Sequence, residues 1–157
     1  MPCPRSSPAR FCAALAALAA LLAAATLAQA QEGPRLPHVE LNVGIHLIHA
    51  EFAADDASRM LGLMYRRTLA PSDGMLFRFD EADKHCMWMR NTFLPLAVAF
   101  LDAHGAVINV EEMQAQTDDT HCAAGPARYA LEMNARWFAQ HGVRPGTVID
   151  GVVAVRR

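Results

Sequence analysis

Apolar residues alternate with other residues from position 39 onward, with the spacing of two that is typical of a β-strand. This alternation predicts one strand that continues towards residue 52 and is formed around Val39, Leu41, Val43, Ile45 and Leu47. After residue 55 the spacing changes to three and four, which indicates a helix with one apolar face. We expect Asp55 to be its N-cap, Gly62 to let a strand pack closely, and the apolar face to hold Ala57, Met60, Leu61 and Met64.

Shorter apolar runs, separated by turn residues, follow along the rest of the chain. They predict a second short helix at 134–141 and further strands at 75–79, 85–90, 96–101, 106–110, 128–133 and 147–155. This pattern favours a compact α+β fold with two short helices. Its antiparallel or mixed sheet is expected to be strongly bent or closed into a small barrel.

The first thirty residues resemble a targeting segment. Arg5 and Arg10 precede an Ala/Leu-rich run, and Ala28-Gln29-Ala30 has the small-x-small form that signal peptidases cleave. The apolar run is short and rich in Ala for a membrane span, so cleavage is favoured over a retained anchor. We expect a cleaved signal peptide at 1–30, a flexible leader at 31–38 and a single domain at 39–157, located in the periplasm or secreted.

Charge narrows the range of partners. Without residues 1–30 the chain has 127 residues, of which 12 are basic and 16 acidic, and no basic run is present. Nucleic-acid binding needs a positive stripe, so a nucleic-acid partner is excluded at this stage. The mature chain contains no second long apolar segment, so no stable membrane anchor is expected after cleavage.

Two cysteines, Cys86 and Cys122, remain after the predicted cleavage. In an oxidising compartment two thiols often form a structural disulfide. Two buried free thiols are the alternative, because the sequence does not show the distance between them. Both possibilities stay open at this point.

The most unusual segment is 85–96, HCMWMRNTFLPL, because its mixture of sulfur, imidazole, indole, guanidinium and amide groups is uncommon in a core strand. In an extended strand, His85, Met87 and Met89 would face one way, and Cys86, Trp88 and Arg90 the other. An arginine fork, an indole and polar groups suit a small polar or anionic ligand. The candidate ligand-binding residues are Trp88, Arg90, Asn91, Thr92, Glu132 and Arg66.

Glu132 lies between Leu131 and Met133 in an apolar strand, where a carboxylate is rarely buried unless it is paired. Arg66 and Arg90 are the expected partners. A structural interpretation therefore competes with ligand binding: Arg90 pairs with Glu132 inside the fold, while Asn91 and Thr92 satisfy a turn. A catalytic interpretation makes Glu132 the acid or base of a hydrolase, which requires a cleft and a raised pKa.

A metal hypothesis starts from two groups of residues with soft ligands. Sulfur and imidazole groups suit copper in an exported protein, and they occur here as His85, Cys86, Met87, His121 and Cys122, with Met75 and Met89 of similar type. Their spacing matches no known ligand pattern, so no metal or other cofactor is assigned. A Cys–His nucleophile is less favoured still, because neighbouring residues on a strand point to opposite faces.

Five blocks, in the same order as in the family, resemble the domain of unknown function 192 family: RMLGLMYR at 59–66, GMLFRF at 74–79, MWMRNTFLPL at 87–96, YALEMN at 129–134 and GVRPGTVID at 142–150. The resemblance implies a barrel-like α+β fold, common in exported prokaryotic proteins, and no established activity, cofactor or substrate. Two positions depart from the family pattern. Ala97 stands where relatives often carry Asp or Ser, and Arg136 where a small residue is typical.

Three functional hypotheses follow. The first is a non-catalytic binding module for a small polar or anionic ligand or a protein partner. The second is a hydrolase that uses Glu132, which the absence of an acid at position 97 weakens. The third is a soft-metal protein that binds copper.

Overall fold

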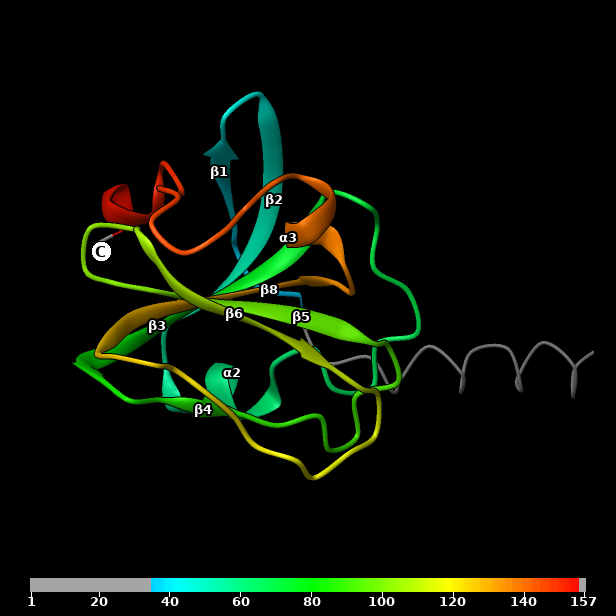
Figure 1. Cartoon of the computed structure of the whole chain (residues 1–157). Helices are drawn as coiled ribbons and strands as arrows, with labels where there is room; N and C mark the ends of the chain where they lie inside the picture. The colour runs from blue at the N-terminus through cyan, green and yellow to red at the C-terminus, as the bar shows by residue number, and fades with distance from the viewer. Residues whose placement is uncertain (1–34, 156–157) are drawn as a thin grey trace, which may run out of the picture. The chain divides into compact units, whose positions relative to one another are not determined.

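The computed structural model describes residues 35–155, so the predicted signal peptide at 1–30 and the first part of the predicted leader lie outside the described residues. A six-stranded mixed sheet has the strand order β1-β2-β3-β8-β5-β6, and a small second sheet pairs β4 with β7 (Figure 1). The strands are β1 His38–Val43, β2 His46–Ala53, β3 Asp73–Asp83, β4 Cys86–Met87, β5 Leu96–Leu101, β6 Val107–Met113, β7 His121–Cys122 and β8 Ala127–Asn134. The helices are α2 Asp56–Leu61, α3 Trp137–Gln140 and the 3-10 helix η2 Val152–Ala154.

A mixed sheet with two short α-helices is confirmed, and the protein is mostly β. The predicted barrel is wrong, because β1 and β6 remain the two edges of the described sheet. The predicted last strand at 147–155 is also wrong. Its residues make isolated bridges, Asp150 with Asn42 and Val148 with Ala106, before the chain turns into η2. These bridges connect the chain at 148–150 to β1 on one edge of the sheet and to the residue before β6 on the other. They do not form a continuous ladder of hydrogen bonds between β1 and β6.

The long first strand is a hairpin. Gly44 adopts a φ of 58°, a left-handed conformation that suits glycine, and the chain reverses there. As a result β1 pairs antiparallel with β2, and Ile45 is 94% exposed in the turn. The alternation was continuous in sequence, but the buried positions change at the turn: Leu41 and Val43 lie in the core before Gly44, whereas after it Leu47 is 41% exposed and Ile48 is buried.

Several local signals are confirmed. Asp55 caps α2 in a capping box with Ser58, and the backbone hydrogen bond from Ser58 lowers the pKa of the Asp55 carboxyl. Strand β5 has the predicted bounds. Gly62 ends α2 with a φ of 50°, a left-handed conformation that suits glycine, and a Cβ at this position would lie 3.4 Å from the Phe77 ring of β3, so the strand also packs closely there.

The second helix is shorter than predicted. It covers Trp137–Gln140, and Arg136, in a left-handed conformation, precedes it, whereas Asn134 belongs to β8. The strand predicted at 85–90 is reduced to Cys86–Met87, because β7 offers only two residues for pairing. Strand β3 is longer than predicted and extends to Asp83.

The six-stranded sheet separates two cores. The face towards α3, called here the α3 face, buries Leu76, Leu131, Trp137 and Phe138 among other apolar residues. The opposite face, called here the α2 face, lies towards α2 and β4 (Figure 1). It buries a second apolar cluster that includes Met75, Phe77, Leu63, Met89 and Val98. The same strands supply both clusters, because successive side chains point to opposite faces.

Candidate functional site

A cleft of about 360 Å³ opens on the α2 face. Helix α2 and the residues after it form one wall, the middle of β3 forms another, and the segment 86–88 forms a third. Thr92 and Glu132 complete it. The lining residues are Asp56, Arg59, Met60, Leu61, Gly62, Leu63, Met64, Phe77, Phe79, Cys86, Met87, Trp88, Thr92 and Glu132.

Glu132 is the buried acid of this cleft. It lies in β8 opposite Met75 of β3 and Val98 of β5, both fully buried, and it is only 4% exposed itself. Within residues 35–155 its carboxylate has no hydrogen-bond or ion-pair partner. Burial in these apolar surroundings raises the pKa of Glu132 from 4.5 to about 8. The group is therefore mostly protonated at neutral pH and acts as a hydrogen-bond donor as well as an acceptor.

The two arginines predicted to pair with Glu132 pair elsewhere. Arg66 is buried and donates to Glu51 at 2.9 Å, and both residues line a separate cavity of about 220 Å³. Arg90 is exposed, donates from Nε to Asp118 at 2.8 Å, and lies 4.7 Å from the centre of the Trp88 ring. The structural interpretation of an Arg90–Glu132 pair is therefore wrong, and Glu132 is left without the cation that the sequence suggested.

Exposure alternates along 85–90 as expected, although most of the segment is not a regular strand and Cys86, Met87 and Trp88 all line the cleft. Met89 is fully buried, and Cys86, Trp88 and Arg90 are exposed. At the end of the segment, Asn91 adopts a φ of 57°, and its carbonyl oxygen accepts a hydrogen bond from the backbone N–H of Tyr65. Asn91 thus shapes a turn, as the structural interpretation expected.

Three of the six predicted ligand-binding residues meet at the cleft. Trp88 and Thr92 line it together with Glu132. Arg90 is a neighbour of Trp88 that does not line it, while Asn91 and Arg66 serve the turn and a buried ion pair. The sequence thus indicated the segment and the acid, and it did not indicate which polar groups reach the cavity.

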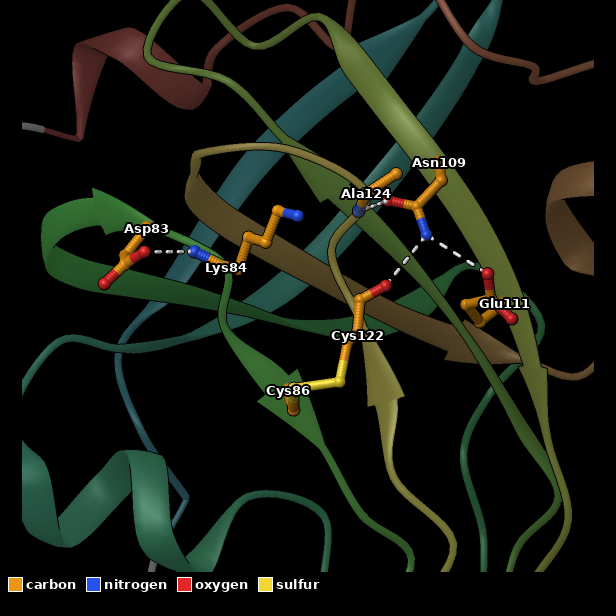
Figure 2. Close-up of a disulfide and its surroundings, with 7 residues drawn as sticks. All are labelled: Asp83, Lys84, Cys86, Asn109, Glu111, Cys122 and Ala124. Carbon is orange, nitrogen blue, oxygen red and sulfur yellow. Dashed lines mark hydrogen bonds between the residues drawn. A yellow bond between two sulfur atoms is a disulfide. The ribbon is translucent and has the colours of Figure 1, made fainter.

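Cys86 and Cys122 form a disulfide that joins β4 to β7 (Figure 2). Behind it, the side chain of Asn109 donates to the carbonyl oxygen of Cys122 and accepts from the N–H of Ala124. Because Cys86 belongs to the cleft wall, the bond holds the segment 86–88 in place. Because both cysteines are bonded to each other, neither offers the free thiolate that the copper and nucleophile hypotheses require. No group of three or more His, Cys, Asp or Glu side chains suited to a metal occurs in the described part of the chain.

Sequence reasoning missed the wall formed by α2 and β3. Met60 and Met64 were expected to pack into the core, but Met60 is 72% exposed and both line the cleft. The buried residue of α2 is instead Ser58, which forms the capping box with Asp55. Helical spacing of apolar residues is the same whether the helix packs into a core or lines a cleft. The sequence pattern around Gly62 therefore could not distinguish the two.

Among the described residues, Arg59 is the only basic residue of the cleft lining, and its guanidinium has several partners. It donates to the carbonyl oxygens of Ala54 and Arg78 at 2.8 and 2.9 Å. It also pairs with Asp80 at 2.9 Å and with Asp56. Arg59 therefore fixes the position of α2 against β3 and leaves no free cation for an incoming anion.

No helix within residues 35–155 is long and apolar enough to cross a membrane. The predicted signal peptide lies outside this range and remains a prediction.

Comparisons place the chain among proteins without an assigned activity. A crystal structure from Sinorhizobium meliloti 1021, described as a "putative transcription regulator", matches with a TM-score of 0.73 and 32% identity over 77% of this chain and 98% of that one. A protein of unknown function from Novosphingobium aromaticivorans DSM 12444 matches with a TM-score of 0.70 and 32% identity, over 73% and 86% of the two chains. No curated protein matches. The model of the DUF192 family, described as "Uncharacterized ACR", matches residues 39–151, and the chain therefore belongs to the DUF192 family.

Proposed function

We propose that this domain is an exported, non-catalytic binding module that takes a small ligand in the cleft on its α2 face. The observation that carries the proposal is Glu132, a buried carboxylate that has no partner among residues 35–155 and lies in a cleft lined mainly by apolar side chains. Buried polar groups are normally paired, so an unpaired one that reaches a cavity is a candidate for ligand contact. A cavity of about 360 Å³ is within the size range of small-molecule sites.

The ligand needs an apolar body as well as a polar group. Met60, Met64, Met87 and Phe79 offer apolar surface, and thioether side chains adapt to different shapes. A purely anionic ligand fits less well than the sequence suggested, because Arg59 is already paired with two carboxylates. A nucleic-acid partner gains no support from the acidic composition of the chain, although one structural neighbour is described as a regulator of transcription.

The disulfide supports export. Structural disulfides persist in oxidising compartments such as the periplasm, and Cys86–Cys122 fits that setting. Together with the predicted signal peptide, it favours a location outside the cytoplasm. Mass spectrometry of the protein secreted from its own signal would test cleavage after residue 30. Retention of residues 1–30 would overturn the proposed export route.

A binding screen by NMR tests the proposed function. Phenethyl alcohol, phenethylamine and phenylpropionate share one apolar body and differ in the polar group. We expect at least one to shift backbone signals of Met60, Met64 and Trp88. Met64→Trp, which fills the cleft, should remove the shifts, and Leu47→Trp on the exposed hairpin should leave them unchanged. Shifts that survive in Met64→Trp would contradict the location of the site.

A hydrolase with Glu132 as general acid is the second candidate. The cleft and the pKa of about 8 meet the two requirements stated for it, because a group that titrates near neutral pH transfers protons efficiently. Among the described residues the lining offers Thr92 and Asp56 but no Ser, His or free Cys, and we expect water to be the attacking group. Turnover of chromogenic esters or glycosides that disappears in Glu132→Gln would support this candidate over a purely binding role.

A further inference from the structure

We propose that the ligand of this cleft is a small organic amine whose ammonium group pairs with Glu132 while its apolar body lies against the methionine and aromatic walls. This inference rests on the proposed binding function and names the ligand class. It follows from three features of the cleft as the described residues form it: an acid without a partner, a lack of free cations, and apolar walls.

The first feature is the missing partner of Glu132. A buried carboxylate is stabilised when a cation or several hydrogen-bond donors reach it. The fold supplies this for the other buried carboxylate, Glu51, which receives Arg66 at 2.9 Å and the N–H of Leu36 at 2.9 Å. Within the described residues Glu132 receives no such contact. A ligand that enters the cleft is positioned to supply it.

The second feature is the charge of the lining. Its charged residues are Asp56, Arg59 and Glu132, and Arg59 is neutralised by Asp56 and by Asp80 outside the cleft. The residues that line the cleft from β3 and from the segment 86–92 carry no charge, and neither does Val98, which faces Glu132 from β5. The uncompensated group is thus an acid, and its natural complement is a cation.

The third feature is the distribution of polarity. The acid on strand β8 is 4% exposed, whereas Met60 and Trp88 of the same lining are 72% and 46% exposed. Met64, Met87 and Phe79 add further apolar surface to the walls. A ligand with a charged head and an apolar tail matches this order, because the head reaches Glu132 while the tail covers the walls. A small inorganic cation would leave the apolar walls uncovered.

Binding of an ammonium group changes the proton balance. The free acid is mostly protonated at neutral pH, since the pKa of Glu132 is about 8. In the complex the ammonium keeps its proton and Glu132 loses its own, so one proton is released to solvent for each ligand bound. Affinity should therefore rise about tenfold from about pH 6 to about pH 7 and level off above about pH 8, as long as the ligand amine stays charged.

Calorimetric titration tests the inference with the three probes of the binding screen. We expect phenethylamine to bind at least about tenfold more tightly than phenethyl alcohol near pH 8, and phenylpropionate to bind most weakly. Titrations in two buffers with different ionisation enthalpies should show release of one proton per phenethylamine near neutral pH. Phenethyl alcohol should release none.

Two variants separate Glu132 from general surface charge. Glu132→Gln keeps the shape and removes the charge, so phenethylamine and phenethyl alcohol should bind about equally and no proton should be released. Asp119→Asn removes an exposed carboxylate that does not line the cleft, and it should leave the preference within about twofold. If Glu132→Gln fails to fold, Glu132→Met provides a second uncharged variant of similar size.

The possible failures are distinguishable. Equal binding of phenethylamine and phenethyl alcohol to the wild-type protein would overturn the amine inference and leave the proposed binding function standing. Tighter binding of phenylpropionate would overturn it in favour of an anion. If none of the three probes binds, both the inference and the proposed function are overturned.

Discussion

The two faces of the six-stranded sheet bury side chains of different character. The α3 face is covered by apolar and aromatic groups, among them Trp137 and Phe138. The α2 face also has an apolar cluster, but the five buried polar residues of the described domain belong to this side: Glu51, Ser58, Arg66, Thr92 and Glu132. Two of them form an ion pair and one completes a helix cap, whereas Glu132 has no partner in the part of the chain that the structure describes.

The different side chains of the two faces suggest different roles: the α3 face contributes stability, and the α2 face carries the candidate site. Close apolar packing of the core on the α3 face contributes free energy of folding. An unpaired buried acid costs free energy, and such costs concentrate at functional sites. The α2 face therefore combines the cleft, the disulfide and the one buried carboxylate that packing alone does not explain.

The largest expected effect is the dependence of stability on pH. Because the pKa of Glu132 rises from 4.5 to about 8 on folding, the folded state holds its proton more tightly than the unfolded state. Its contribution is fully present below about pH 4.5 and is lost as pH rises through about 8, by up to about 5 kcal/mol. Urea unfolding across this window should show the loss in the wild type and its absence in Glu132→Gln. Parallel profiles in the two proteins would contradict the account.

Removal of a large side chain from the α3 face should have the next largest effect. Phe138 is fully buried there, so Phe138→Ala is expected to lower the free energy of unfolding by about 3–5 kcal/mol. Met60→Ala on the cleft wall is the matched change, and because Met60 is largely exposed it should cost no more than about 0.5 kcal/mol. If denaturant unfolding shows a similar loss of unfolding free energy in both variants, the proposed difference between the two faces is wrong.

Loss of the disulfide should have an intermediate effect. The bond links residues 36 positions apart, and its removal in the double variant Cys86→Ser, Cys122→Ser should cost about 2–4 kcal/mol. Reductant should destabilise the wild type by a similar amount and leave the double variant unchanged. A reductant effect of equal size in both proteins would show that the bond is not its cause.

The smallest effect on stability is expected at Trp88. It is 46% exposed, so Trp88→Ala should lower the free energy of unfolding by less than about 1 kcal/mol, while phenethylamine binding should weaken severalfold. Phe93→Ala is the control, because Phe93 is similarly exposed but does not line the cleft. Equal loss of binding in both variants would place the ligand outside the cleft.

The parts of the fold that could be predicted are those with local signals. A continuous apolar run identified β5, and Asp55 identified the start of α2. Sequence periodicity did not identify the hairpin at Gly44, because a left-handed glycine reverses the chain without interrupting the alternation. Whether the sheet closes into a barrel depends on pairing between strands far apart in sequence, which local patterns do not specify.

The candidate site was also predictable only where a local sequence signal marked it. Glu132 stood out because a charge in an apolar strand is unusual whatever surrounds it. Its pairing was wrong because Arg66 and Arg90 have closer partners in Glu51 and Asp118, and those distances arise only when distant segments come together.

The most direct test of the account is an NMR titration of the Glu132 carboxyl carbon in the wild-type protein without ligand. The signal can be assigned by its disappearance in Glu132→Gln. We expect a midpoint near 8, because the carboxyl is buried in the cleft and no described residue pairs with it. A midpoint near 4.5 would contradict the account, since it would mean that solvent or a cation reaches Glu132 in the free protein.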